Sequence, residues 1–270
     1  MSQSQCEPDG RGGSAGGNSA VARRRLLALS LTWVAGFVDA VGYLTLYRVF
    51  TANMSGNSVA MGLHAAGGQW RRAAHRGFPI LMFVAGLVLC GAVHELARRR
   101  KLRRALAVTL AMESLLLLAF MVLGAYFGQR RGVAGDAPPW TAALPVAAAA
   151  LAMGLQNASL TRVGALSIHT THVTGELTRL GEEAVAYLFW LGEHWADSAG
   201  GAAAGRVWRA ARESCRREEL QNIVTQSLLW AFYVAGAAWG GVMLGRWGFG
   251  CVALPIGVLL AAVAGMWRGM

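Results

Sequence analysis

Apolar residues along this chain gather in six long runs that are nearly free of charged side chains. Polar, basic and glycine-rich stretches lie between these runs. Each run is about 20 residues long, the length that an α-helix needs to cross the hydrocarbon core of a bilayer. We therefore predict six transmembrane helices, over residues 26–47, 78–97, 105–127, 141–161, 223–245 and 247–267.

The composition of the chain agrees with a location in a membrane. Of the 270 residues, 55% are hydrophobic and 14% are charged. In a soluble domain about a quarter of the residues are charged, so this chain carries roughly half of the charge that a soluble surface needs. The predicted fold class is all-α, a polytopic membrane protein with about six transmembrane helices. The four cysteines form no C-x-x-C pair, so no disulfide framework or zinc site is indicated.

The distribution of basic residues predicts the orientation of the chain. It contains 25 lysines and arginines against 14 acidic residues, a net charge of +11. The bases lie in short clusters at the ends of apolar runs, such as 23–25 and 98–104, whereas a nucleic-acid-binding protein gathers them on one face. With the N-terminus in the cytoplasm, 18 bases fall inside and 6 outside. Since cytoplasmic loops are enriched in basic residues, we predict that both termini are cytoplasmic and that nucleic acid is not a partner.

The chain divides into two halves joined by a short loop. Its first residues are too rich in Gly and Ser to bury a core. The predicted organisation is a disordered cytoplasmic tail (1–25), a first three-helix repeat (26–127), an external loop (128–140) and a second three-helix repeat (141–268) with a cytoplasmic insert (182–220). Within the insert, residues 184–195 are apolar but too short to cross a bilayer, which indicates a cytoplasmic or interfacial helix.

The two halves share an internal sequence repeat. Three pairs of blocks align: 36–40 with 154–158 at an offset of 118, 51–57 with 170–176 at an offset of 119, and 83–86 with 233–236 at an offset of 150. Because each repeat holds three spans, an odd number, the second copy enters the membrane from the opposite side, as in the inverted repeats of secondary transporters. Chance similarity between helices rich in Gly and Ala is the alternative.

The repeated blocks also carry a family resemblance. The run GFVDAVGYL at 36–44, followed by ANMSGN at 52–57, resembles the signature of the YoaK family of bacterial inner-membrane proteins, also catalogued as domain of unknown function 1275. Residues 156–158 and 170–175 resemble the second-half signature of that family. The resemblance implies a six-span protein of the bacterial inner membrane whose activity is unassigned. The glycine-rich tail and the insert depart from the family pattern.

Asp39 is a carboxylate near the centre of the first predicted span, where a charged residue costs about 2.5 to 3.5 kcal/mol on insertion. Such residues usually face the protein interior and often belong to a proton or substrate path. The repeat partner of Asp39 is Asn157, and we predict that the two side chains meet near the bilayer midplane. A structural Asp39 that caps a broken helix or pairs with a polar neighbour is the alternative.

The blocks 51–57 and 170–176 are small, polar and glycine-containing, which favours a broken or re-entrant segment in each repeat. Exposed backbone ends at such breaks bind ions and anionic groups. The candidate substrate or ion pathway consists of Asp39, Asn53, Ser55, Asn57, Asn157, Thr170, His172, Thr174 and Glu176. An interfacial turn between helices is the alternative for both blocks.

Glu113 is a second carboxylate inside a predicted span and has no acidic counterpart in the repeat. We interpret it as a candidate proton relay, with a structural hydrogen bond as the alternative. His169, His172 and Glu176 would share one face of a helix, as metal ligands do. Gly175 interrupts that stretch and no fourth ligand is evident, so we expect neither a metal nor a cofactor.

Two G-x-x-x-G patterns, at 236–240 and 241–245, lie in the fifth predicted span. Small residues at this spacing allow two helices to approach each other closely. We therefore predict that both patterns are packing faces.

Together these features predict a secondary transporter or permease for a small solute or ion. The expected partners are the lipid bilayer and an unknown solute or ion, and a homo-oligomer is an open alternative to a monomer. The chain contains no H-E-x-x-H metal motif and no nucleotide-binding glycine loop, so we do not expect an enzyme. The alternative function is a non-catalytic membrane scaffold or regulatory protein, in which the repeat serves only for packing.

Overall fold

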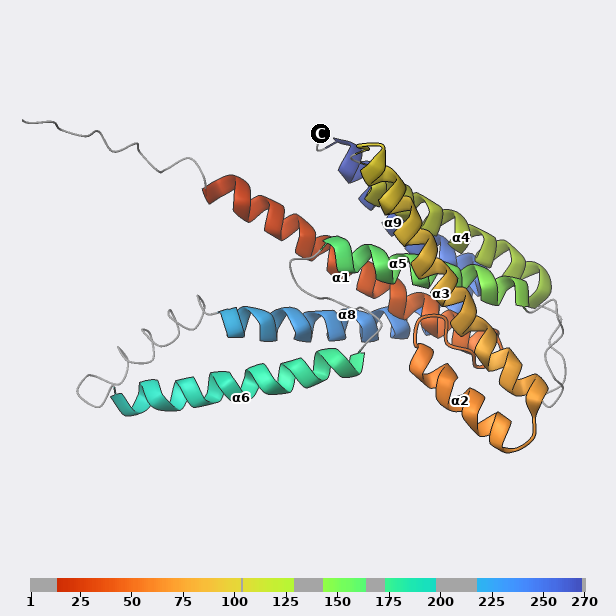
Figure 1. Ribbon diagram of the computed structural model, residues 1–270, viewed down its shortest axis with the longest axis horizontal. Helices are drawn as coiled ribbons and strands as arrows, with labels where there is room; N and C mark the ends of the chain where they lie inside the picture. Colours follow the sequence, from red (N-terminus) through yellow and green to blue (C-terminus); the bar gives the residue numbers. More distant parts are fainter. Residues whose placement is uncertain (1–13, 103, 129–142, 164–172, 198–217, 269–270) are drawn as a thin grey trace, which may run out of the picture.

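The structure of the protein is a computed structural model, which describes residues 14–102, 104–128, 143–163, 173–197 and 218–268 (Figure 1). All regular elements among these residues are helices. In chain order they are α1 (Ser14–Thr45), α2 (Met54–Ala66), α3 (Trp70–Arg99), α4 (Ala105–Gly128), α5 (Ala143–Val163), α6 (Val173–Asp197), α8 (Glu218–Trp247), the 3₁₀ helix η2 (Gly248–Val252) and α9 (Ala253–Arg268).

Five helical segments among the described residues are long and apolar enough to cross a membrane: Val21–Thr45, Trp70–Arg99, Ala105–Phe127, Ala143–Thr161 and Leu220–Trp267. The last segment contains both the fifth and the sixth predicted spans, which η2 divides into α8 and α9. Gly248, with a φ of 54°, lies at this break, because glycine adopts left-handed backbone without a steric penalty. The prediction of an all-α polytopic membrane protein is therefore confirmed.

Two helices begin earlier than the sequence predicts. α1 starts at Ser14, so residues 14–25 of the predicted disordered tail are helical. Ala and Arg are good helix formers, and a helix that is already nucleated gains one hydrogen bond for each added residue. α6 starts at Val173, ahead of the predicted insert at 182, and it includes the whole of the predicted short helix at 184–195.

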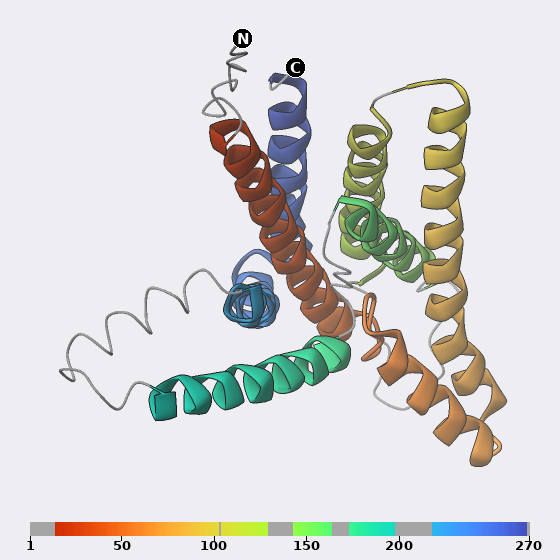
Figure 2. The ribbon, with the colours of Figure 1, turned by 60° about the vertical axis from the view of Figure 1, so that its left-hand side comes forward.

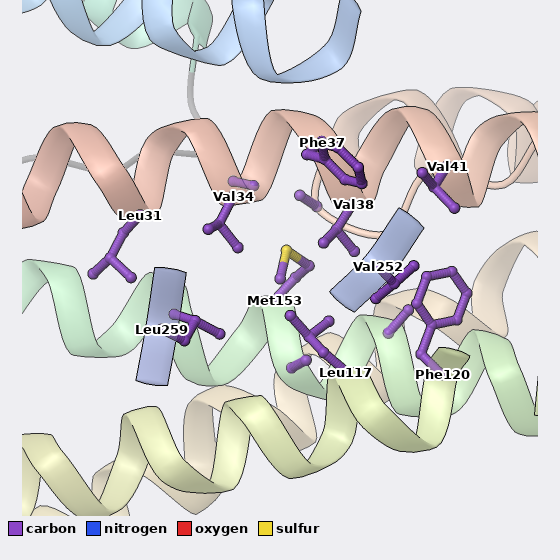
Figure 3. Close-up of a cluster of buried hydrophobic side chains, with 14 of the residues drawn as sticks. Leu31, Val34, Phe37, Val38, Val41, Leu117, Phe120, Met153, Val252 and Leu259 are labelled. Atoms are coloured by element: carbon purple, nitrogen blue, oxygen red, sulfur yellow. The ribbon is translucent and has the colours of Figure 1, made fainter. Parts of the chain in front are cut away.

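The apolar core lies between α1, α4, α5 and α9 (Figure 3). α1 contributes a fully buried stripe at three- and four-residue spacing, consisting of Leu31, Val34, Val38 and Val41. Met153 of α5 lies in the same cluster. Many large apolar side chains on the outward faces of the helices are exposed, as contact with a lipid bilayer requires.

Corresponding helices of the two halves run in opposite directions along the horizontal axis of Figure 1: α1 against α5, α3 against α8, and α4 against α9. The starts of α2 at Met54 and of α6 at Val173 are also related by the repeat offset of 119. This arrangement supports the inverted repeat, and it adds α2 and α6 as a corresponding pair of helices.

The first helix of each half packs against a helix of the other half. Gly36 of α1 lies against the backbone carbonyl of Tyr233 on α8. Gly154 of α5 lies in the same way against the carbonyl of Phe83 on α3. A β-carbon added at either glycine would collide with that oxygen. The repeat relates the two contacts: the offset of 118 leads from Gly36 to Gly154, and the offset of 150 leads from Phe83 to Tyr233.

The reciprocal contacts follow the same rule. Gly236 of α8 lies against the carbonyl of Trp33, and Gly86 of α3 lies against the carbonyl of Leu151. These residue pairs are again related by the offsets of 150 and 118. The two sequence halves are therefore interlocked, because each contributes one helix to each close pair.

Against the described residues, only the first G-x-x-x-G pattern of α8 is a packing face. A β-carbon added at Gly240 would lie 2.7 Å from the carbonyl oxygen of Phe37, so Gly236 and Gly240 both face α1. In the second pattern, Gly241 is near only the side chain of Leu44, at 3.8 Å, and Gly245 faces open space. The prediction for 241–245 is therefore wrong for contacts with the described part of the chain.

Both described chain ends lie at one end of the helix bundle. The start of α1, the turn between α3 and α4, and the end of α9 lie there together (Figures 1 and 2). The guanidinium of Arg104 lies 4.2 Å from the ring centroid of Trp267. The basic residues 23–25 and the described bases of 98–104 thus share one end of the bundle, whereas α2 and the start of α3 lie at the opposite end.

Candidate functional site around Asp39

Asp39 lies on α1, six residues before the helix ends at Thr45. At 1.5 Å per residue this places it about 9 Å from that end, so it is nearer to the end of the span than the sequence predicts. The side chain is buried, with 3% of its surface exposed. Its surroundings must therefore supply the hydrogen bonds that water would otherwise make.

The carboxylate of Asp39 accepts hydrogen bonds from two separate parts of the chain. Its Oδ1 accepts from the backbone N–H of Thr51 at 2.6 Å, the hydroxyl of Thr51 at 3.2 Å and the N–H of Ala52 at 2.8 Å. Its Oδ2 accepts from the hydroxyl of Tyr233 on α8 at 2.7 Å. Asp39 therefore joins α1, the connection between α1 and α2, and α8.

The connection between α1 and α2 folds back along α1 to reach Asp39. Tyr47 and Arg48, with φ values of 54° and 59°, turn the chain in left-handed backbone. Thr51 then packs against Gly42, where an added β-carbon would lie 2.5 Å from its methyl group. A non-helical segment thus runs beside the last turns of α1, as the prediction of a broken segment for the first repeat expects.

Asn57 holds the folded-back segment to the start of α2. The amide of this fully buried side chain accepts a hydrogen bond from the N–H of Phe50 at 3.1 Å and donates one to the carbonyl of Phe50 at 2.7 Å. Asn53 caps α2, because its side-chain oxygen accepts from the N–H of Gly56 at 3.3 Å and from the hydroxyl of Ser55 at 2.7 Å.

Among the candidates of the first half, the structure brings Asp39, Asn53, Ser55 and Asn57 into one segment of α1, α2 and their connection. Asn157 is buried on α5, with 6% of its surface exposed, and its predicted meeting with Asp39 stays a prediction. Glu113 is fully buried on α4, and neither of its carboxyl oxygens has a hydrogen-bond partner within the described part of the chain.

The second-half block is only partly described. Thr170 and His172 lie outside the described residues, as does His169. Thr174 and Glu176 belong to the first turn of α6, and their side chains are not described.

Sequence reasoning missed Tyr233, which supplies the link from Asp39 to the second half. The repeat aligns Tyr233 with Phe83, and the two side chains differ only in the hydroxyl of the tyrosine. This difference could have indicated a polar contact at Tyr233. A buried tyrosine hydroxyl needs a partner, and a buried carboxylate on a helix of the other half offers one.

Comparison with known proteins identifies one family. Residues 27–265 match the family described as a protein of unknown function (DUF1275). The chain is also 31% identical over 176 residues to the UPF0700 transmembrane protein YoaK of Bacillus subtilis (strain 168), an alignment that covers 63% of this chain and 72% of the relative. No solved structure matches the chain.

Proposed function

This chain belongs to the DUF1275 family of transmembrane proteins, and from this premise we propose that it is a secondary transporter or permease for a small solute or ion. The description of the family names no activity, so the proposal rests on the geometry of the polar residues of this chain. We place it in the bacterial inner (cytoplasmic) membrane, with both termini in the cytoplasm. The clustering of residues 23–25 and 98–104 at one end of the bundle favours that orientation.

The observation that carries the proposal is the position of Asp39. Its carboxylate joins a non-helical segment inside the helical bundle to α8 of the other half. Non-helical backbone at membrane depth is tolerated where protein or a water-filled cavity surrounds it. In secondary transporters, broken helices of this kind hold the substrate or the coupling ion at the interface of the repeats. Asp39, Asn53, Ser55 and Asn57 are the residues that we propose for this pathway.

The packing of the helices offers a route for alternating access. The close pairs are α1 with α8 and α3 with α5, and the repeat offsets exchange one pair for the other. We infer that the two pairs, rather than the two sequence halves, move against each other as rigid bodies. The hydrogen bond between Asp39 and Tyr233 lies inside the α1–α8 pair, so it would travel with that pair.

A non-catalytic scaffold is the second candidate. It is favoured by the number of hydrogen bonds at Asp39, because four donors satisfy this carboxylate in the way that a purely structural residue requires. We also propose that the protein is not an enzyme, and this proposal rests on the sequence alone.

Uptake by intact cells that overproduce the chain tests the transporter proposal. The panel consists of labelled amino acids, sugars, organic acids, and sodium and rubidium ions. For any solute that accumulates, Asp39→Asn is expected to reduce uptake to nearly the level of cells without the chain. Glu95→Gln, at the exposed end of α3, is the matched control and is expected to leave uptake unchanged.

Full uptake by Asp39→Asn, with unchanged pH dependence, would contradict the mechanism. A size-exclusion profile in detergent establishes that each variant is folded. A scaffold would give a different pattern: no solute in the panel would accumulate, Asp39→Asn would behave as the wild type, and Gly236→Leu would fail to assemble because it disrupts the α1–α8 contact.

A further inference from the structure

A second group of polar side chains is buried between α3, α4 and α5, away from the hydrogen bonds of Asp39. The hydroxyl of Ser159 on α5 donates to the hydroxyl of Thr109 on α4 at 3.1 Å. The thiol of Cys90 on α3 lies 3.5 Å from the same Ser159 hydroxyl. Glu113 follows Thr109 by one turn of α4, and Gln156 precedes Ser159 by one turn of α5. We call Thr109, Glu113, Gln156 and Ser159 the α4–α5 polar cluster.

The geometry places Glu113 and Gln156 on the same side of the Thr109–Ser159 contact. α4 and α5 are consecutive helices that run in opposite directions (Figure 1). A step forward along α4 from Thr109 therefore goes the same way as a step backward along α5 from Ser159. Both steps lead toward the apolar core, in which Leu117 and Met153 lie one turn farther (Figure 3).

This cluster has more hydrogen-bond acceptors than donors. Both carboxyl oxygens of Glu113 and the Oε1 of Gln156 are buried without a described partner, whereas the Nε2 of Gln156 donates to the carbonyl of Leu31. Glu113 is 0% exposed and Gln156 is 1% exposed. An ionised carboxylate with no partner is very costly in such surroundings. Among the described residues, no arginine, lysine or histidine is fully buried as Glu113 is, although the Nε2 atoms of His75 and His94 on α3 are shielded from solvent.

The equivalent positions of the first half are apolar. The repeat offset of 118 relates Gln156 to Val38 and Ser159 to Val41. Both valines are 0% exposed and belong to the core stripe of α1. The fold thus packs this position with aliphatic side chains in one half, so packing alone gives no reason for an amide and a hydroxyl in the other half. Their presence beside an unpartnered carboxyl points to a ligand that supplies a donor.

We propose that the α4–α5 polar cluster is a proton-binding site, with Glu113 as the group that is protonated and Gln156 as the acceptor of its O–H. Binding forms one O–H bond on Glu113 with a proton taken from water, and release returns the proton to water. The proton then occupies the place of the missing donor. The binding of the proton does not depend on the proposed transporter function. A role for this proton as the coupling ion of transport does rest on that function.

Few other titratable groups face this site. On the elements packed against α4, the titratable groups with buried atoms among the described residues are the thiols of Cys90 on α3 and Cys251 in η2 and the imidazoles of His75 and His94 on α3. His94 follows Cys90 by one turn of α3, toward the end of that helix. The charged residue of α5 is Arg162, which follows Ser159 and so lies on the side of the Thr109–Ser159 contact away from Glu113 and Gln156, and the described side chains of α9 include no carboxyl or amine. Protonation in this region therefore reports mainly on Glu113.

Infrared spectroscopy of the reconstituted protein tests the site without any solute. At neutral pH the wild type is expected to show the C=O stretching band of a buried carboxylic acid, and Glu113→Gln is expected to lose that band completely. Raising the pH should replace the band by carboxylate bands in the wild type. Gln156→Val, which installs the residue of the other half, should shift the acid band because the O–H loses its acceptor. Glu95→Gln is the control and should leave the band in place.

Three results would overturn the inference: a band that survives in Glu113→Gln, a band that does not respond to pH while the protein is folded, or a band removed by sodium at constant pH. The last result would make this a sodium site. Because the measurement uses no solute, its failure is independent of transport. A titrating Glu113 band in a protein that transports no solute would instead reject the proposed function and leave the proton site standing.

Discussion

The hydroxyl of Tyr233 on α8 donates a 2.7 Å hydrogen bond to the carboxylate of Asp39 on α1. The two residues are 194 positions apart in the sequence, so this bond ties the halves of the chain together. The other oxygen of the same carboxylate holds the backbone of Thr51 and Ala52. A substitution of Tyr233 or Asp39 is therefore expected to affect both the folded-back segment and the packing of α1 against α8.

We predict that Tyr233→Phe lowers the free energy of unfolding by about 2 kcal/mol, since a hydrogen bond to a charged group contributes roughly 1.5–3 kcal/mol. Thermal unfolding in detergent measures the effect as a lower midpoint. Tyr126→Phe is the matched control, because Tyr126 lies on α4 with 71% of its surface exposed. Equal midpoints for the two variants would show that the bond to Asp39 contributes nothing.

We predict that Asn57→Ala loosens the folded-back segment. The substitution leaves the partly buried N–H and carbonyl of Phe50 without their partner, at a cost of about 1 kcal/mol for each hydrogen bond. Hydrogen–deuterium exchange should therefore become faster at the amide of Phe50. In Ser58→Ala the exchange should stay unchanged, because the exposed Ser58 hydroxyl bonds only to the carbonyl of Met54 in its own helix.

Alanine substitutions at Gly36 and Gly154, the glycines of the two close helix pairs, are expected to destabilise the protein to a similar extent. Gly36→Ala and Gly154→Ala each place a methyl group against a backbone carbonyl, and overpacking of this kind costs about 1–3 kcal/mol. Gly257→Ala on α9 adds the same methyl group in open space and should be neutral. The yield of folded protein after detergent extraction is the measurement. A loss at only one of the two glycines would argue against their equivalence.

The orientation of the chain can be read from the reaction of single cysteines with a membrane-impermeant maleimide. The background carries Cys6→Ser and Cys215→Ser, because the native thiols Cys90 and Cys251 are buried. Ser58→Cys on α2 should be labelled in intact cells.

The matching position at the other end of the bundle is Arg100, which is exposed at the turn between α3 and α4. Arg100→Cys should be labelled only after the membrane is permeabilised. The reverse pattern would place both termini outside and contradict the orientation inferred from the basic clusters.

The sequence predicts which segments are helical, because an apolar run of membrane-spanning length has few other stable structures. It also predicts the buried carboxylates Asp39 and Glu113 and a break after the first span. The break covers residues 46–53, whereas residues 54–57 of the predicted segment belong to α2. These features depend on local composition. The starts of α1 and α6 lie earlier than the sequence predicts, because a helix extends beyond its apolar run wherever the preceding residues tolerate helical backbone.

The partners of these residues depend on tertiary packing, and there the sequence is less informative. The two glycine patterns of α8 look the same in the sequence. The glycines at 236–240 face α1, whereas Gly245 of the second pattern faces open space. Similarly, the partners of Asp39 lie on the folded-back segment and on α8, whereas the repeat alone directs attention to Asn157. The repeat relates positions that are equivalent, and equivalent positions need not touch.

The pairing of α1 with α8 has a consequence for how the protein is made. α1 leaves the ribosome first, but Asp39 meets Tyr233 only after 194 further residues have been added. At about 5–20 residues per second, synthesis of that stretch takes roughly 10–40 s. For this time the glycine face of α1 lacks α8, and the Oδ2 of Asp39 lacks the hydroxyl of Tyr233. The packing of α1 against α8 therefore forms late in synthesis, after the helices between them have been added.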